Sequence, residues 1–142
     1  MTWPAKWTDP ALPGERFLDF TRKPADNQGV FRELGVRLLK APGDFGVCDE
    51  FGGPELLIPE FREALLEFLR EDRPVLGVFK APQAAEAVSR RITLGKDYLS
   101  AWQQIYALLS EDKNTRLLET TGRYDEKARS AVLSWVKENV RR

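Results

Sequence analysis

One short stretch, residues 45–56 (Phe-Gly-Val-Cys-Asp-Glu-Phe-Gly-Gly-Pro-Glu-Leu), constrains the fold of this chain more than any other. A short apolar run ends in two adjacent carboxylates, Asp49 and Glu50, and a glycine pair follows before an amphipathic helix. This order is typical of a buried parallel strand that delivers acidic side chains to the carboxyl edge of an α/β sheet. Because open α/β sheets bind their ligands at that edge, the stretch predicts both a fold class and the place of a functional site.

The remainder of the chain alternates between strand and helix patterns. Short apolar runs predict strands over residues 16–20, 45–49, 75–79 and 115–119. Helical spacing and start signals predict helices over residues 28–41, from Pro54 or Pro59 to about Glu71, near 83–91, over 98–111 with Asp97 as N-cap, and onward from an N-cap at Asp125. A strand over residues 36–39 is the alternative within the first helix. The alternation predicts an α/β fold with a mostly parallel small sheet of about four strands and flanking helices.

Two parts of unequal size are expected along the chain. Residues 1–15 predict an extended N-terminal arm, because three prolines interrupt any regular element there: Pro4, Pro10 and Pro13. The arm carries Trp3 and Trp7, and aromatic side chains are favoured anchors at protein interfaces. Residues 16–142 predict a single α/β domain, which is long enough to bury one hydrophobic core.

Composition excludes several classes of function. The 22 basic and 22 acidic residues cancel, so the basic excess of a nucleic-acid-binding surface is missing. No apolar run approaches the roughly 20 residues of a membrane span. The chain has no histidine and one cysteine, Cys48, which excludes His-based nucleophile pairs and argues against zinc. We expect Cys48 to be a small buried hydrophobic side chain, and we expect the protein to be cytoplasmic.

The expected carboxyl edge of the sheet collects side chains suited to a metal-bound phosphate. They are two carboxylates, a lysine, two hydroxyls and an arginine: Asp49, Glu50, Lys80, Thr120, Thr121 and Arg123. We expect Asp49 to hold Mg²⁺ through water and Glu50 to orient or deprotonate an attacking water. The other four are candidates for binding the phosphates of a nucleotide. The alternative for the two acids is that they only cap the strand and bond into the turn that follows.

An ordered series of motifs resembles the second half of the small P-loop nucleoside-triphosphatases. The series runs through Phe31-Arg32-Glu33-Leu34-Gly35-Val36, Val47-Cys48-Asp49-Glu50-Phe51-Gly52, Gly53-Pro54-Glu55-Leu56, Phe61-Arg62-Glu63-Ala64 and Arg73-Pro74-Val75-Leu76-Gly77-Val78. In that family a helix precedes an Asp-Glu-x-Gly Walker B strand, and the next helix leads to a Pro-Val-Leu strand. The resemblance covers roughly residues 28–80. It implies that Asp49 is the Mg²⁺-associated acid and Glu50 the catalytic acid.

The family's phosphate-binding Walker A loop, Gly-x-x-x-x-Gly-Lys-Ser/Thr, does not occur in these 142 residues. The one Gly-Lys pair is Gly95-Lys96, and Arg90 and Asp97 stand where the loop requires Gly and Ser/Thr. The expected fold is therefore P-loop-NTPase-like but lacks the strand that carries the phosphate loop.

Three functional hypotheses follow. The first is a degenerate or split nucleoside-triphosphatase that binds Mg²⁺ and a nucleotide, with a partner chain supplying the phosphate loop. The second is a non-catalytic interaction domain, in which the arm with Trp3 and Trp7 mediates either homodimer formation or the docking of a partner. The third is an α/β protein that binds a phosphorylated metabolite at the same edge.

Overall fold

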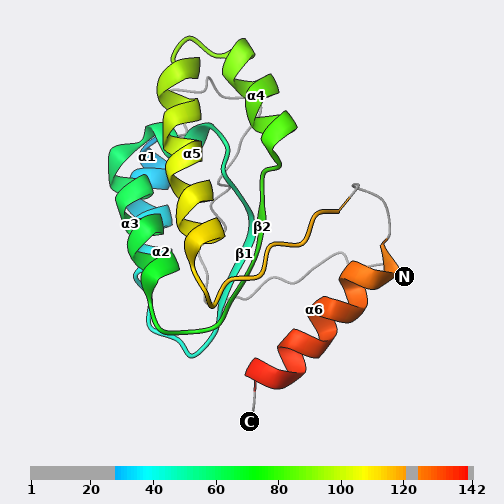
Figure 1. Cartoon of the computed structure of the whole chain (residues 1–142). Helices are drawn as coiled ribbons and strands as arrows, with labels where there is room; N and C mark the ends of the chain where they lie inside the picture. The colour runs from blue at the N-terminus through cyan, green and yellow to red at the C-terminus, as the bar shows by residue number, and fades with distance from the viewer. Residues whose placement is uncertain (1–27, 121–124, 141–142) are drawn as a thin grey trace, which may run out of the picture.

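A computed structural model of the chain describes residues 28–120 and 125–140 (Figure 1). At its centre lie two parallel strands, β1 (Gly46–Phe51) and β2 (Val75–Phe79). Their pairing begins with Gly46 opposite Val75. Helices precede, connect and follow the strands, so the fold is α/β, as predicted.

Helical segments account for most of the remaining described residues. They are α1 (Gln28–Val30), η2 (Phe31–Gly35, a π-helix), α2 (Val36–Leu39), η3 (Pro54–Leu57, a 3₁₀-helix), α3 (Pro59–Arg70), α4 (Pro82–Arg91), α5 (Gly95–Glu111) and α6 (Glu126–Asn139). The helix predicted over residues 28–41 is confirmed up to Leu39, and the alternative strand over residues 36–39 is wrong. The cap at Asp125 is confirmed, because its carboxylate accepts a hydrogen bond from the Ala128 N–H at 3.1 Å.

Two expectations about local structure are wrong. Residues 115–119 form no strand: Leu117 and Leu118 are their only apolar side chains, and both are more than 40% exposed. Asp97 does not cap α5, because that helix already begins at Gly95 with Leu94 as its N-cap. The prediction of about four strands also differs from the described residues, whose sheet has two. The predicted strand over residues 16–20 and the arm over residues 1–15 lie outside the described residues.

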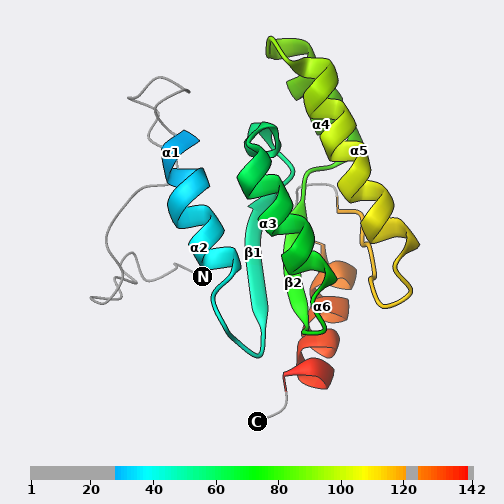
Figure 2. The ribbon, with the colours of Figure 1, turned by 90° about the vertical axis from the view of Figure 1, so that its left-hand side faces the viewer.

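The hydrophobic core lies on one face of the sheet, beneath α3 and α5 (Figures 1 and 2). Both helices are amphipathic, and their apolar stripes point toward the strands. The largest fully buried side chains come from η3, α3 and α5: Leu56, Leu65, Tyr98 and Ile105, each less than 2% exposed. From the strands, Phe51 belongs to the same buried cluster, and Val75 and Phe79 pack against it.

The opposite face of the sheet is covered differently. Figure 1 shows α6 on the side of the strands away from α3 and α5. A ring contact joins it to the start of β1, with Phe45 and Trp135 centroids 5.7 Å apart. None of the described residues of α6 is buried. The helix therefore contacts this side of the structure through Trp135 without enclosing a second core.

An arginine secures the amino end of the sheet. The Arg73 guanidinium donates to the carbonyl oxygens of Leu39, Ala41 and Gly43 and lies 4.8 Å from the centroid of the Phe68 ring. Arg73 thereby ties the carboxyl end of α2 to the start of β2. Across the described part of the chain, no helix has both the length and the apolar character needed to cross a membrane.

Candidate functional site

An irregularity in the β1–β2 pairing shapes the expected site. Cys48 pairs with Gly77, and the next pair is Phe51 with Phe79, so β1 advances three residues while β2 advances two. Asp49 and Glu50 occupy the irregular step, and both are exposed. Bulges of this kind redirect side chains and are frequent beside active sites. The bulge therefore leaves both carboxylates accessible to solvent at the end of a strand.

Glu50 and Lys80 are brought together, although 30 positions separate them in the sequence. Lys80 Nζ lies 3.1 Å from Glu50 Oε1. The Lys80 side chain is 20% exposed, whereas that of Glu50 is 66% exposed. The parallel pairing explains the contact, because both residues stand at the carboxyl ends of neighbouring strands. The pair places a cation and a carboxylate within reach of one ligand.

The backbone of Lys80 is held from two sides. Its N–H donates to the Phe51 carbonyl at 2.9 Å, which extends the β1–β2 ladder by one bond. Its carbonyl accepts a hydrogen bond from Trp102 Nε1 at 3.0 Å. Trp102 belongs to α5 and is only 5% exposed. The long lysine side chain can therefore move while its attachment point stays fixed.

The turn after β1 is closed by Glu55, not by the two acids before it. Glu55 Oε1 accepts from the N–H groups of Gly52 at 3.0 Å and Gly53 at 2.8 Å. Gly52 has φ +97°, a conformation that favours glycine. Glu55 therefore accepts the hydrogen bonds of the two glycine N–H groups in this turn, and neither Asp49 nor Glu50 caps them. The short spacing from the glycine pair to Glu55 was the sequence signal for this turn.

A buried tyrosine completes the support of the turn. Tyr98 Oη donates to the Gly52 carbonyl at 2.7 Å, and the residue is fully buried. Burial, reinforced by the negative charge of Glu55, raises the pKa of Tyr98 to about 12. Tyr98 therefore stays neutral and donates its hydrogen bond across the physiological range. No role was predicted for Tyr98 from the sequence, because its hydrogen-bond partner lies 46 positions away.

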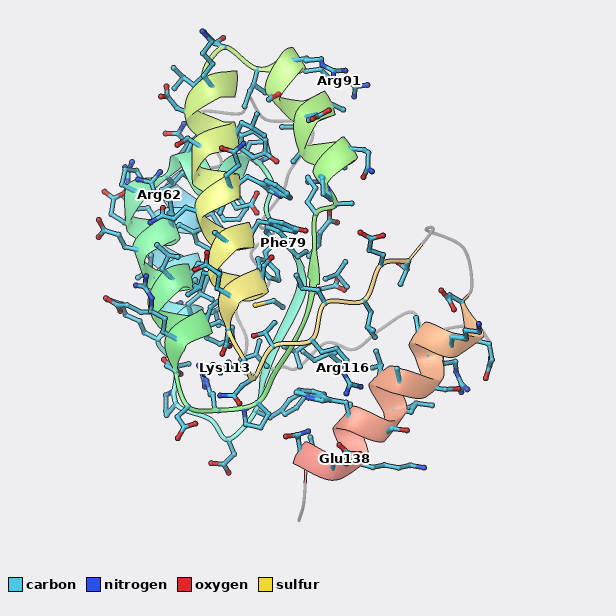
Figure 3. All side chains as sticks on the ribbon, in the orientation of Figure 1. Arg62, Phe79, Arg91, Lys113, Arg116 and Glu138 are labelled. Atoms are coloured by element: carbon cyan, nitrogen blue, oxygen red, sulfur yellow. The ribbon has the colours of Figure 1, made fainter. Side chains whose placement is uncertain are left out.

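A group of stacked rings lies next to Lys80. The Phe79 and Trp102 rings are 5.3 Å apart and nearly parallel, and Tyr106 stacks on Trp102 at 5.0 Å. Figure 3 shows Phe79 where β2 faces α5. Tyr106 is 38% exposed, so one ring of the group reaches the surface.

The remaining predicted site residues are not gathered by the described structure. Thr120 is exposed and follows the irregular segment after α5, while Thr121 and Arg123 lie outside the described residues. No cluster of three or more metal-ligating side chains occurs within the described ranges. Asp49 and Glu50 could supply one or two carboxylates to Mg²⁺, which commonly keeps several waters and takes substrate phosphates as further ligands.

Cys48 is half-buried and packs against the core, in agreement with its expected hydrophobic role. Burial raises the pKa of its thiol, and the nearby charge of Arg73 opposes that shift only in part. The thiol is therefore protonated at neutral pH and is a poor nucleophile.

Comparison with known proteins gives one partial relationship. A protein described as "Nucleoside-triphosphatase THEP1", from Ignicoccus hospitalis, is 35% identical to this chain over 85 residues. The aligned part covers 55% of this chain and 50% of that protein, so the chain spans about half the length of the curated relative it matches. No protein-family model matches the chain, and no solved structure matches it significantly. The relationship supports a distant likeness to P-loop nucleoside-triphosphatases.

Proposed function

We propose that this chain forms the Walker B half of a nucleoside-triphosphatase-like site that binds a Mg²⁺–nucleotide when a partner polypeptide supplies the phosphate loop. The observation that carries the proposal is the Glu50–Lys80 pair, 3.1 Å apart at the carboxyl edge of two parallel strands. The partial similarity to a nucleoside-triphosphatase supports the same proposed function.

Each residue of the proposed site has a chemical role. Asp49 binds Mg²⁺ through water, and Glu50 positions or deprotonates the attacking water. Lys80 neutralises phosphate charge. When a phosphate oxygen replaces Glu50 as the partner of Lys80, the Glu50 carboxylate becomes free to act on the water. Three residues complete the phosphate contacts in this proposal: Thr120, Thr121 and Arg123.

A nucleotide titration tests the proposal. The full chain is titrated with fluorescent ATP and GTP analogues in the presence of Mg²⁺, alone and together with a synthetic polypeptide that carries a strand and a Gly-x-x-x-x-Gly-Lys-Thr loop. We expect binding only in the mixture, because backbone amides of the missing loop provide most phosphate contacts. Absence of binding at millimolar nucleotide in the mixture would contradict the proposal.

Two substitutions separate binding from chemistry. Lys80→Ala should weaken nucleotide binding by about tenfold or more, since a charge-assisted phosphate contact is lost. Glu50→Gln should leave affinity nearly unchanged and lower hydrolysis by about 10²–10⁴-fold, the range of a general base. The matched controls, Lys113→Ala and Glu67→Gln, remove exposed charges elsewhere and should change neither quantity. A phosphorylated-metabolite protein would instead lose affinity in Lys80→Ala without any hydrolysis.

The exposure of two valines on the α6 side of the sheet favours a second candidate, a non-catalytic interaction domain. Val47 is 68% exposed and Val78 is 59% exposed. In this version the arm with Trp3 and Trp7 drives homodimer formation. Deletion of residues 1–14 should then convert a dimer to a monomer, measured by light scattering. An unchanged mass would exclude this candidate.

A further inference from the structure

A groove of about 910 Å³ runs along the side of β2 that faces away from β1. One wall is β2 itself, with Val75, Leu76, Gly77 and Phe79. The opposite wall is the irregular segment 114–118, whose Arg116 is visible between β2 and α6 in Figure 3. The carboxyl-terminal part of α5 and residues of α6, including Trp135, also line it. The groove thus has a strand along one side and an unpaired extended segment along the other.

The backbone of β2 offers hydrogen-bonding groups to this groove. The Gly46 N–H donates to the Pro74 carbonyl, and the Lys80 N–H donates to the Phe51 carbonyl. The backbone N–H and C=O groups of even-numbered residues in β2 therefore point toward β1. Since backbone groups alternate along a strand, the N–H and C=O groups of Val75, Gly77 and Phe79 point the other way. Within the described residues the sheet has no third strand to pair with them.

The segments of this chain are poor candidates for the groove. Residues 115–118 already form its far wall and do not pair with β2. A strand over residues 16–20 would connect through α2 to β1. Since α2 contacts α3 and therefore lies on the same face, a right-handed crossover would place such a strand at the other edge of β1. Residues 1–15 lack an uninterrupted apolar run and contain three prolines, which disfavour a central strand.

We propose that this groove, the β2 groove, accepts an apolar β-strand of a partner polypeptide, inserted between β2 and residues 115–118. Addition of a strand to an open sheet edge is an established mode of recognition, in which main-chain bonds supply affinity. The inserted strand should be apolar where it faces Leu108 and Leu109 of α5 on one side and Val132 and Trp135 of α6 on the other.

The direction of the inserted strand rests on the proposed function. The phosphate loop must reach the carboxyl edge near Lys80, so the strand that precedes it has to run parallel to β2. The β2 groove is then the surface on which the partner that carries the phosphate loop docks. No strand pairs with residues 115–118 within the described ranges, and the inserted strand would supply that pairing.

Amide hydrogen exchange, measured by NMR on the full chain, tests strand insertion directly. The probe is a synthetic peptide with a Val/Ile-rich strand of about five residues followed by a Gly-x-x-x-x-Gly-Lys-Thr loop. In the free chain, the amides of Val75, Gly77 and Phe79 should exchange faster than those of Leu76 and Val78, which bond to β1. Peptide binding should slow exchange at the first three by about tenfold or more.

Matched substitutions locate the binding surface. Leu76→Lys places a charge on the groove wall and should weaken peptide binding by about tenfold or more. Its control is Val47→Lys, because Val47 is the register partner of Leu76 and does not line the groove. On the far wall, Leu117→Glu should weaken peptide binding as much as Leu76→Lys does. Its control is Leu133→Glu, because Leu133 is an exposed residue of α6 that does not line the groove. Leu117 lies in an irregular segment, so this second variant serves if Leu76→Lys fails to fold.

Several results would overturn the docking proposal. Protection of the three amides in the free chain at every concentration would mean that a segment of this chain already fills the groove. Protection that grows with protein concentration would assign the groove to a second copy. Peptide binding that both wall variants leave unchanged would place the contact elsewhere. If the peptide inserts but the mixture binds no nucleotide, the docking proposal stands and the proposed function is refuted. If the mixture binds nucleotide but the three amides are not protected, the proposed function stands and the docking proposal is refuted.

Discussion

The two faces of the β1–β2 sheet differ in how completely their side chains are buried. On the face toward α3 and α5, four core side chains, Leu65 and Tyr98 among them, are less than 2% exposed. On the face toward α6, Val47 is 68% exposed, and none of the described α6 residues is buried. Since burial of apolar surface supplies most of the stabilisation of a fold, the core beneath α3 and α5 should contribute more to stability than the α6 side of the described structure. The α6 side is the more exposed of the two faces in the described structure.

The largest difference between the faces should appear on truncation of apolar side chains. Leu65→Ala, in α3, removes a buried side chain and should lower the free energy of unfolding by about 2–5 kcal/mol. Leu133→Ala, in α6, is the matched control, because Leu133 is 42% exposed and its truncation should change stability by less than about 0.5 kcal/mol. Urea denaturation monitored by circular dichroism measures both. Equal losses would refute the contrast between the faces.

The turn that leads from β1 into the core should be nearly as sensitive. Gly52→Ala introduces a side chain at φ +97° and places its Cβ 2.7 Å from the Phe79 ring. The change should cost about 1–3 kcal/mol through backbone strain and displacement of the ring. Gly29→Ala has open space around its Cβ and should stabilise its helix by about 0.5–1 kcal/mol. Thermal denaturation of the two variants distinguishes strain from a general effect of adding a methyl group.

The core face should also respond to alkaline pH through Tyr98. Its pKa is raised from 10.0 to about 12 in the folded protein, because the buried ring resists ionisation. The stability that the neutral form contributes is therefore complete below pH 10 and is lost as pH rises toward 12. Tyr98→Phe should be less stable than the native chain at neutral pH, and the gap should narrow as pH rises over this interval. A constant gap would show that the hydroxyl does not titrate as described.

A smaller effect is expected on the α6 side. Asp125→Ala removes the carboxylate that accepts from the Ala128 N–H and should destabilise α6 by about 1 kcal/mol. Because α6 encloses no core, the effect should remain local. Hydrogen exchange should accelerate in α6 and stay unchanged in α3. Acceleration in both helices would show that the two faces unfold as one unit.

The smallest effect on stability should come from the proposed site. The Glu50–Lys80 pair is exposed on the glutamate side, and exposed pairs contribute less than about 1 kcal/mol. Glu50→Gln should therefore leave the urea midpoint almost unchanged, so that any loss of activity can be assigned to chemistry. A large loss of stability would instead identify the pair as a structural element.

Much of the local architecture could be read from the residues in sequence order. The all-apolar run over residues 75–79 predicted β2, the helical spacing of α3 predicted its buried stripe, and Asp125 predicted a cap. These features depend on neighbours within a few positions, which is why periodicity and side-chain type were sufficient. The expectation of a strand over residues 115–119 was wrong because a strand also needs a partner, and pairing is a property of the whole sheet.

The sequence by itself determined which chemical groups this chain can offer: carboxylates, a lysine and hydroxyls, without histidine. It also placed Asp49 and Glu50 toward the carboxyl end of a strand. Only the tertiary structure decided that Glu50 meets Lys80, that Glu55 and Tyr98 rather than the adjacent acids hold the turn, and that β2 keeps an open side. The physical reason is that each of these contacts joins groups whose approach depends on turn geometry, strand register and helix packing, none of which is set by local spacing alone.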